Sequence, residues 1–202
     1  MKLYYSPGAC SLSVHITLLE AGMAFSLVAA PTKTHKLADG TDYYSINPLG
    51  YVPVLELDDG TRLREGPAIV QYIADQLPDH RLAPANGTVQ RAQMQGWLNF
   101  TGSELHKGIA PLFNAATPAD YKVMVIDKLM SRLTWVDEQL AGKHYLMGDA
   151  FSVADPYLFN VTSWAPLVKV DISGFANIAA FRERMKARPA VQAAMRAEGL
   201  IK

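Results

Sequence analysis

The stretch MKLYYSPGACSLSVHITLLEAG (residues 1–22) decides the fold of the first part of the chain. The run KLYY is apolar and aromatic, so it predicts a short β-strand, and the SPG turn ends that strand. The residues after the turn predict a helix that stops at a glycine, because Leu12, Ile16 and Leu19 fall on one stripe. Cys10, the only cysteine of the chain, therefore stands where the strand ends and the helix begins.

The segments that follow continue the alternation of strands and helices. They predict a second strand in AFSLVAA (24–30), a hairpin in VPVLELDDGTRLRE (52–65) and a helix in GPAIVQYIADQL (66–77). The order β-α-β followed by β-β-α is typical of a small α/β sandwich.

The second part of the chain predicts only helices. Segment 78–87 contains proline, glycine and asparagine and predicts a linker. The helices that we expect after it cover residues 88–113, 118–140, 153–168 and 178–188. The sequence therefore predicts an α/β domain over residues 1–80 and an all-helical domain over residues 87–202.

Composition excludes several classes of function for these 202 residues. Half are hydrophobic, and 19 Lys and Arg balance 19 Asp and Glu, so nothing indicates binding to nucleic acid or anionic membranes. The apolar runs are shorter than the roughly 18 residues of a membrane span, and MKLYYSPG turns too soon for a signal-peptide core. A single cysteine forms no intramolecular disulfide and no thiolate metal site, which fits a reducing cytoplasm.

Cys10 is the first candidate for chemistry. Unpaired N–H groups at a helix N-terminus favour a thiolate, so we expect the Cys10 pKa to lie below the usual value of about 8.5. A buried structural cysteine is the alternative, and the residues alone leave both open. His15 lies roughly 140° further around the helix, so we expect it to be packed or capping rather than a base for Cys10.

Two backbone sites could recognise a small peptide-like molecule. The proline after Val52 predicts a bend that leaves the Val52 backbone free for an extended ligand, or simply a strand start. Glu65 and Gly66 begin the next helix, whose N-terminus favours a carboxylate while Glu65 favours an ammonium group. The pair could bind the amino-acid end of a molecule, or Glu65 could only cap the helix.

Polar residues on the later helices carry two further hypotheses. Asn99, Ser103 and His106 follow i, i+4, i+7 spacing and should lie within about 40° of one another. Such a stripe suits a cleft wall, although an interior histidine with satisfied hydrogen bonds is the alternative. Ser152 and Asp155 predict a capping box, which stabilises a helix and does no chemistry.

These segments together resemble the bacterial beta-class glutathione S-transferases over nearly the whole chain. The resemblance is carried by MKLYYSPGACSLS, INPLGYVPVLELDDG, EGPAIVQYIAD, WLNFTGSELHKG, SVADPYLF and AEGLIK. It implies a thioredoxin-like N-terminal domain, a helical C-terminal domain, a cis Val52–Pro53 bond and a homodimer. It also implies glutathione as co-substrate, and no metal.

The resemblance also implies roles for individual residues. The glutathione contacts of the family fall on Cys10, Val52, Glu65, Gly66, Asn99, Ser103 and His106. Of these, Cys10 and His106 are also the expected catalytic residues, with Ser11 as a helper hydroxyl, while Tyr5 is expected to pack. The family often has a lysine where this chain has His35, so either His35 or the following Lys36 would bind the glycyl end of glutathione.

We therefore expect a glutathione transferase that conjugates glutathione to hydrophobic electrophiles, with Cys10-dependent thiol-disulfide exchange as an additional activity. Trp164 and Phe113 are candidates for the wall of the electrophile subsite. The alternative function is a non-enzymatic binding or scaffold protein with the same fold.

Overall fold

Four short strands form one mixed sheet in the computed structural model, which describes residues 1–202. β1 runs parallel to β2 and antiparallel to β3, and β4 pairs antiparallel with β3. Leu3 and Leu55 are register partners on the two central strands, and both are fully buried. The strands and the hairpin therefore lie where the sequence predicts them, in the order β2-β1-β3-β4: β1 (Lys2–Tyr5), β2 (Ser26–Ala29), β3 (Val54–Glu56) and β4 (Arg62–Arg64).

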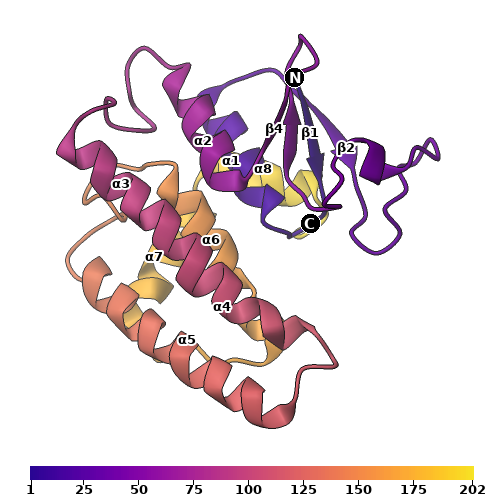
Figure 1. Cartoon of the computed structure of the whole chain (residues 1–202). Coiled ribbons are helices and arrows are strands. Elements are labelled where there is room, and N and C mark those ends of the chain that lie inside the picture. Colours follow the sequence, from indigo (N-terminus) through magenta and orange to yellow (C-terminus); the bar gives the residue numbers. More distant parts are fainter. The chain divides into compact units, whose positions relative to one another are not determined.

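Helices α1 (Ser11–Ala21) and α2 (Gly66–Asp75) pack against each other and against the sheet (Figure 1). α1 ends at Gly22, whose φ of 69° allows its backbone N–H to bond back to the last turn. The apolar face of α2 buries Ile69 and Ile73 completely. Both helices therefore contribute to the core beneath the sheet, as their apolar stripes predict.

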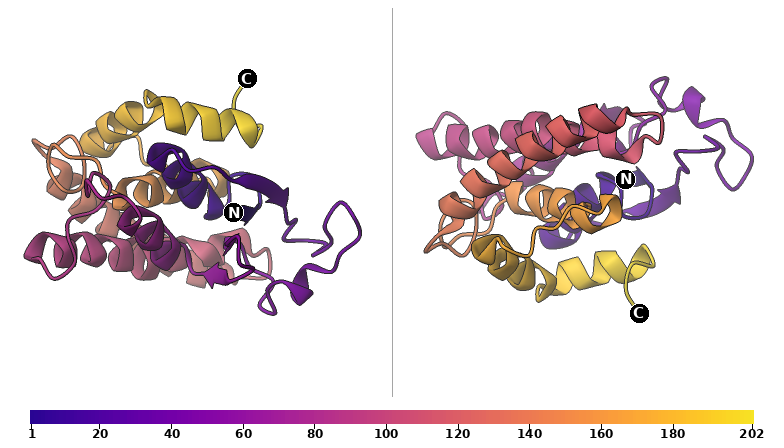
Figure 2. Two further views of the ribbon diagram at one scale, coloured as in Figure 1. Left: turned by 90° about the horizontal axis from the view of Figure 1, so that it is seen from above. Right: turned by 90° about the horizontal axis from the view of Figure 1, so that it is seen from below.

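The last helix, α8 (Pro189–Ala197), runs beside α1 (Figure 2). It buries Val191 completely. Arg188, at its N-terminal end, forms a two-pronged ion pair with Glu20 of α1, with Nε–Oε1 and Nη2–Oε2 distances of 2.6 and 2.9 Å. α8 is thus fixed to α1 by both apolar packing and a bidentate arginine–carboxylate pair.

Packing divides the chain into two compact units. One consists of Met1–Ala83 together with Ala187–Lys202, and the other of Pro84–Lys186. The predicted helical domain, residues 87–202, differs from the second unit because its last sixteen residues pack with the sheet-containing part. Periodicity predicts which face of a helix is buried, but it does not predict which part of the molecule that face packs against.

The helical unit begins with continuous helical structure over residues 89–113. It changes type along its length and consists of α3 (Val89–Phe100), the π-helical segment η2 (Thr101–His106), α4 (Lys107–Ile109) and the 3-10 turn η3 (Ala110–Phe113). Thr88 caps the start by accepting a hydrogen bond from the Arg91 N–H at 3.1 Å. The sequence predicts this segment as one helix and gives no sign of the π-turn.

Helices α5 (Ala119–Leu140), α6 (Ala154–Ser163) and α7 (Ala176–Lys186) complete this unit, with the 3-10 turn η4 (Ala165–Val168) directly after α6. α6 lies beside α3 and α7 (Figure 1) and also contacts η2. Its residues from 154 to 162 are all buried. α6 is therefore the central element of the helical core.

A buried carboxylate fixes the start of α6. Asp155 accepts hydrogen bonds from the backbone N–H and the hydroxyl of Ser152 at 2.7 and 3.0 Å, and from the Leu146 N–H at 2.9 Å. The Ser152 hydroxyl in turn accepts from the Ala154 N–H at 3.3 Å. This reciprocal bonding is the capping interaction that the sequence predicts, and Asp155 also ties down the preceding loop.

No helix of the chain combines the length and the apolar character needed to cross a membrane. No three His, Cys, Asp or Glu side chains are grouped so that they could hold a metal ion.

Candidate active site

Cys10 lies at the N-cap of α1, directly after the turn that follows β1, and is partly exposed. Its side chain makes no capping hydrogen bond to α1. Instead the thiol donates to the backbone carbonyl of Val52, with an Sγ–O distance of 3.1 Å. The thiol therefore lies at the helix end as predicted, but its hydrogen bond goes to the Val52 carbonyl and not to the helix.

Ser11 stabilises the turn that carries Cys10. Its hydroxyl accepts from the Ser6 N–H and donates to the Ser6 carbonyl, both at 3.2 Å, and the residue is fully buried. The only O–H proton of Ser11 is thus used within the turn. These contacts give Ser11 a structural position, and its helper role stays a prediction.

A second anchor of the same turn comes from the C-terminal end of the chain. The Glu198 carboxylate is completely buried and accepts from the Gly8 N–H and from His15 Nδ1, each at 2.9 Å. The His15 ring also packs edge-on against Phe25 with ring centres 5.5 Å apart. His15 is therefore packed, as predicted, and Glu198 is a residue that the sequence did not single out.

The Val52–Pro53 bond is cis, as the resemblance implies. The bend places Val52 next to Cys10, whose thiol bonds to the Val52 carbonyl, while the Val52 N–H has no acceptor within the chain. The neighbouring Tyr51 carbonyl is already held by the Tyr43 hydroxyl and by Asn47 at 2.9 and 2.7 Å. At this bend, the Val52 backbone is thus the part that an extended ligand could pair with.

His35 and Lys36 differ sharply in their surroundings. The His35 ring stacks on Tyr44 with ring centres 4.5 Å apart, and a Cβ on Gly50 would lie only 2.8 Å from its Nε2. Lys36 is exposed and its ammonium group has no partner within the chain. Of the two residues left open by the sequence, Lys36 is the one whose charge is available.

Glu65 adopts an unusual backbone conformation at the start of α2, with φ of 66° and ψ of 108°. It is exposed, and its carboxylate makes no cap, hydrogen bond or ion pair within the chain. Non-glycine residues rarely adopt such angles, and those that do cluster at functional sites. Simple helix capping is therefore not the role of Glu65. The next residue, Gly66, is the first of α2, so its backbone N–H lies at the same helix N-terminus.

The α-helical spacing from which the stripe of three polar residues was predicted does not hold along the whole segment. Asn99 and Ser103 are exposed, and the Ser103 hydroxyl donates to the Asn99 carbonyl at 2.9 Å. His106 ends the π-helical segment η2, in which each residue turns through a smaller angle than in an α-helix. The spacing rule for an α-helix therefore misplaces His106 relative to the other two.

His106 is instead fixed by aromatic residues of the helical core. Its Nδ1 lies 2.8 Å from the Tyr157 hydroxyl, and its ring meets Trp164 edge-on at 4.8 Å. Trp164 also meets Phe113, with ring centres 6.2 Å apart. Burial, assisted by the charge of Lys107, lowers the pKa of His106 to about 4, so the imidazole is neutral near pH 7 and supplies no positive charge to a thiolate.

Two family models match the chain. The model for the glutathione S-transferase N-terminal domain matches residues 8–76, and the model for the C-terminal domain matches residues 100–189. Glutathione S-transferase GstA of Escherichia coli O157:H7 is 48% identical over 200 residues, which cover 99% of this chain and 100% of the relative. The chain belongs to the glutathione S-transferase family.

Solved structures of bacterial glutathione S-transferases share the fold over their full length. The bacterial beta-class enzyme of Sphingomonas chungbukensis is 44% identical, with a TM-score of 0.95 over 100% of both chains. A sphingomonad glutathione S-transferase complexed with glutathione is 43% identical, with a TM-score of 0.94, again over 100% of both chains. These findings confirm the predicted fold class, a thioredoxin-like domain plus a helical domain, and the resemblance to the beta class.

The protein is therefore a glutathione transferase enzyme, and the scaffold alternative is not supported. Sequence reasoning missed Tyr157 and Glu198, which hold His106 and the Cys10 turn of this transferase. Both stand in segments that carry the resemblance, SVADPYLF and AEGLIK. Residue spacing could not reveal either role, because Tyr157 and Glu198 contact residues that are far away in the sequence.

Proposed function

We propose that this transferase binds glutathione mainly through Glu65 and joins the glutathione thiolate to hydrophobic electrophiles, forming a carbon–sulfur bond while the leaving group of the electrophile departs. The observation that carries the proposal is the Glu65 carboxylate, which is held at a φ of 66° and has no partner within the chain. Such a group can pair with the α-ammonium of the γ-glutamyl residue. The backbone N–H at the helix end, at Gly66, can donate to the α-carboxylate of the same residue. The family resemblance assigns the same two residues.

The cysteinyl part of glutathione would pair with the Val52 backbone. The Val52 N–H lacks an acceptor, and the Val52 carbonyl accepts a hydrogen bond only from the Cys10 thiol, which is a weak donor. A backbone amide of glutathione is a stronger donor, so binding would displace the thiol from this carbonyl. Cys10 would then be released at the moment when the glutathione sulfur arrives.

For the glycyl carboxylate we propose Lys36. Its ammonium group is exposed and unpaired, whereas His35 is stacked on Tyr44 and packed against Gly50. Lys36 supplies a permanent charge at neutral pH, which a histidine does not supply reliably.

From the helical unit we assign Asn99, Ser103 and His106 to glutathione on the basis of the resemblance. The exposed side chains of Asn99 and Ser103 can accept and donate hydrogen bonds. Neutral His106, with Nδ1 engaged by the Tyr157 hydroxyl, has only Nε2 left to offer. If Tyr157 donates to Nδ1, Nε2 carries the proton and can donate to an anionic sulfur.

A second activity of the same site is thiol-disulfide exchange through Cys10, favoured by the partial exposure of this thiol. The Cys10 thiolate would attack oxidised glutathione, forming a Cys10–glutathione disulfide and releasing one reduced glutathione as the leaving thiolate. The thiolate of a substrate thiol would then attack the glutathione sulfur of the mixed disulfide, forming a substrate–glutathione disulfide and releasing the Cys10 thiolate.

We further propose a homodimer in the cytoplasm, where reduced glutathione is available, and an electrophile subsite that includes Trp164 and Phe113. The direct test is retention on immobilised glutathione followed by a spectrophotometric conjugation assay with a chlorinated nitrobenzene. Retention with turnover is expected. A folded protein that neither binds the resin nor turns over would contradict the proposal.

A further inference from the structure

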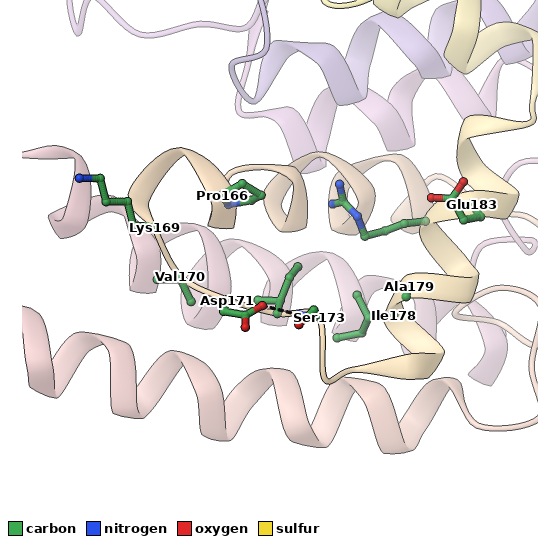
Figure 3. Close-up of a pocket in the computed structure, with 10 residues that line it drawn as sticks. Pro166, Lys169, Val170, Asp171, Ser173, Ile178, Ala179 and Glu183 are labelled. Carbon is green, nitrogen blue, oxygen red and sulfur yellow. Dashed lines mark hydrogen bonds between the residues drawn. The ribbon is translucent and has the colours of Figure 1, made fainter.

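The helical unit has a hollow of about 500 Å³ beside η4 and the start of α7. Figure 3 shows Pro166 on one side, Asp171 and Ser173 on the connecting loop, and Ile178 on α7. Pro166, Val170 and Ile178 make much of its wall apolar. Its volume falls within the range of roughly 300–1,000 Å³ that is typical of small-molecule sites.

Arg182 gives this hollow a positive charge without a carboxylate partner. Its Nη1 donates to the Thr162 hydroxyl at 3.0 Å, and its guanidinium carbon lies 5.7 Å from the centre of the Phe159 ring. No other hydrogen bond or ion pair involves its guanidinium. Burial lowers the pKa of Arg182, and the nearby charge of Glu183 opposes this effect in part. Arg182 is half-buried, and buried arginines are ordinarily paired with an anion.

Two carboxylates also line the hollow, and neither forms a hydrogen bond or ion pair with Arg182, although the charge of Glu183 acts on it. Asp171 accepts a hydrogen bond from the Ser173 N–H at 2.9 Å, drawn as a dashed line in Figure 3. Glu183 accepts one from the Lys186 ammonium at 2.7 Å. Both acids are exposed, so solvent screens their charge more strongly than that of Arg182. Lys169, also exposed, adds a second positive charge to the lining.

We propose that this hollow binds a small carboxylate with an apolar body. The carboxylate would lie against the planar guanidinium of Arg182, whose fork of N–H donors matches its two oxygens. The apolar body would lie along Pro166, Val170 and Ile178. None of the residues that line the hollow is among those assigned to glutathione, so the proposed site is separate from the transferase chemistry.

Benzoate is a suitable probe, and neutral benzamide of nearly the same shape is its control. The full-length protein would be titrated with each while backbone amide signals are followed by NMR. Benzoate should shift the signals of residues 169–183 saturably, with a dissociation constant in the millimolar range, and benzamide should not. Equal shifts with benzamide, or none with benzoate, would overturn the proposal.

Variants locate the binding. Arg182→Gln should raise the benzoate dissociation constant at least about tenfold, whereas Lys33→Gln, the same charge change at an exposed residue of the other unit, should leave it unaltered. Arg182→Lys keeps the charge but loses the fork, so it should bind more weakly than the original chain even if Arg182→Gln does not fold. Undiminished binding in the folded Arg182 variants would refute the assignment.

Discussion

Replacing Glu65 by glycine should separate folding from glutathione binding. The φ of 66° and ψ of 108° at this residue cost a non-glycine side chain roughly 1–3 kcal/mol. Glycine relieves that strain but costs roughly 0.5–1 kcal/mol through the greater freedom of the unfolded chain. Since the carboxylate makes no contact within the chain, the free energy of unfolding should stay the same or rise by up to about 2.5 kcal/mol.

Glutathione binding by Glu65→Gly should weaken, although the stability of the fold is kept or raised. A charge-assisted hydrogen bond from the ammonium group of glutathione to Glu65 contributes about 1.5–3 kcal/mol. Its loss raises the dissociation constant by roughly 12- to 150-fold, and exposure of Glu65 favours the lower end of that range. Glu65→Gln is the matched control, because it removes the charge, keeps the side-chain length and retains the backbone strain.

Calorimetric titration with glutathione and urea denaturation of the same preparations would measure both effects. Glu65→Gln should bind as weakly as Glu65→Gly without the gain in stability. If Glu65→Gly instead lowers stability by more than about 1 kcal/mol and leaves the dissociation constant unchanged, Glu65 is a structural residue. The proposed recognition of the γ-glutamyl end would then be refuted.

Three further substitutions test other parts of the site. Tyr157→Phe removes a neutral hydrogen bond to His106 and should lower kcat/KM roughly 2- to 12-fold. The pH profile above about pH 5 should stay the same, because His106, with its pKa of about 4, is already neutral there. Unchanged kinetics would mean that His106 is structural. Asp155→Asn should reduce the free energy of unfolding by about 3 kcal/mol in urea while leaving turnover of the folded enzyme intact; a selective loss of turnover would contradict this. Ser11→Ala should cost about 1–2 kcal/mol of stability through its two bonds to Ser6, and a conjugation rate that collapses at full stability would restore its catalytic role.

Local patterns in the sequence were sufficient to predict most elements. The hairpin turn at DDG and the capping pair Ser152–Asp155 act over short separations, and the structure has both. α1 forms as predicted, but Ser11–Leu18 are all buried and not only its apolar stripe. Val52 and Glu65, which we propose as site residues, were also singled out by backbone arguments, because a proline before a strand and a helix N-terminus restrict the chain locally.

The partners of the site residues could not be predicted in the same way. The Cys10 thiol bonds to Val52 rather than to its own helix, and Glu198 reaches the Cys10 turn from the far end of the chain. The predicted stripe assumes α-helical spacing up to His106, but His106 ends a π-helical segment, and no residue of TGSELH signals that change. Contacts over such separations depend on tertiary packing, which periodicity does not encode.

Cys10 is the residue on which the proposed chemistry depends most directly. The decisive measurement is the intact mass of the native protein after purification without reductant and after incubation with oxidised glutathione, followed by exchange and conjugation assays on Cys10→Ala. We expect one glutathionyl group that reductant removes, loss of exchange in the variant, and part of the conjugating activity retained, because Glu65 and the Val52 backbone still bind glutathione. A native thiol that stays unmodified, together with exchange that survives in Cys10→Ala, would show that Cys10 only packs and would contradict the proposed role.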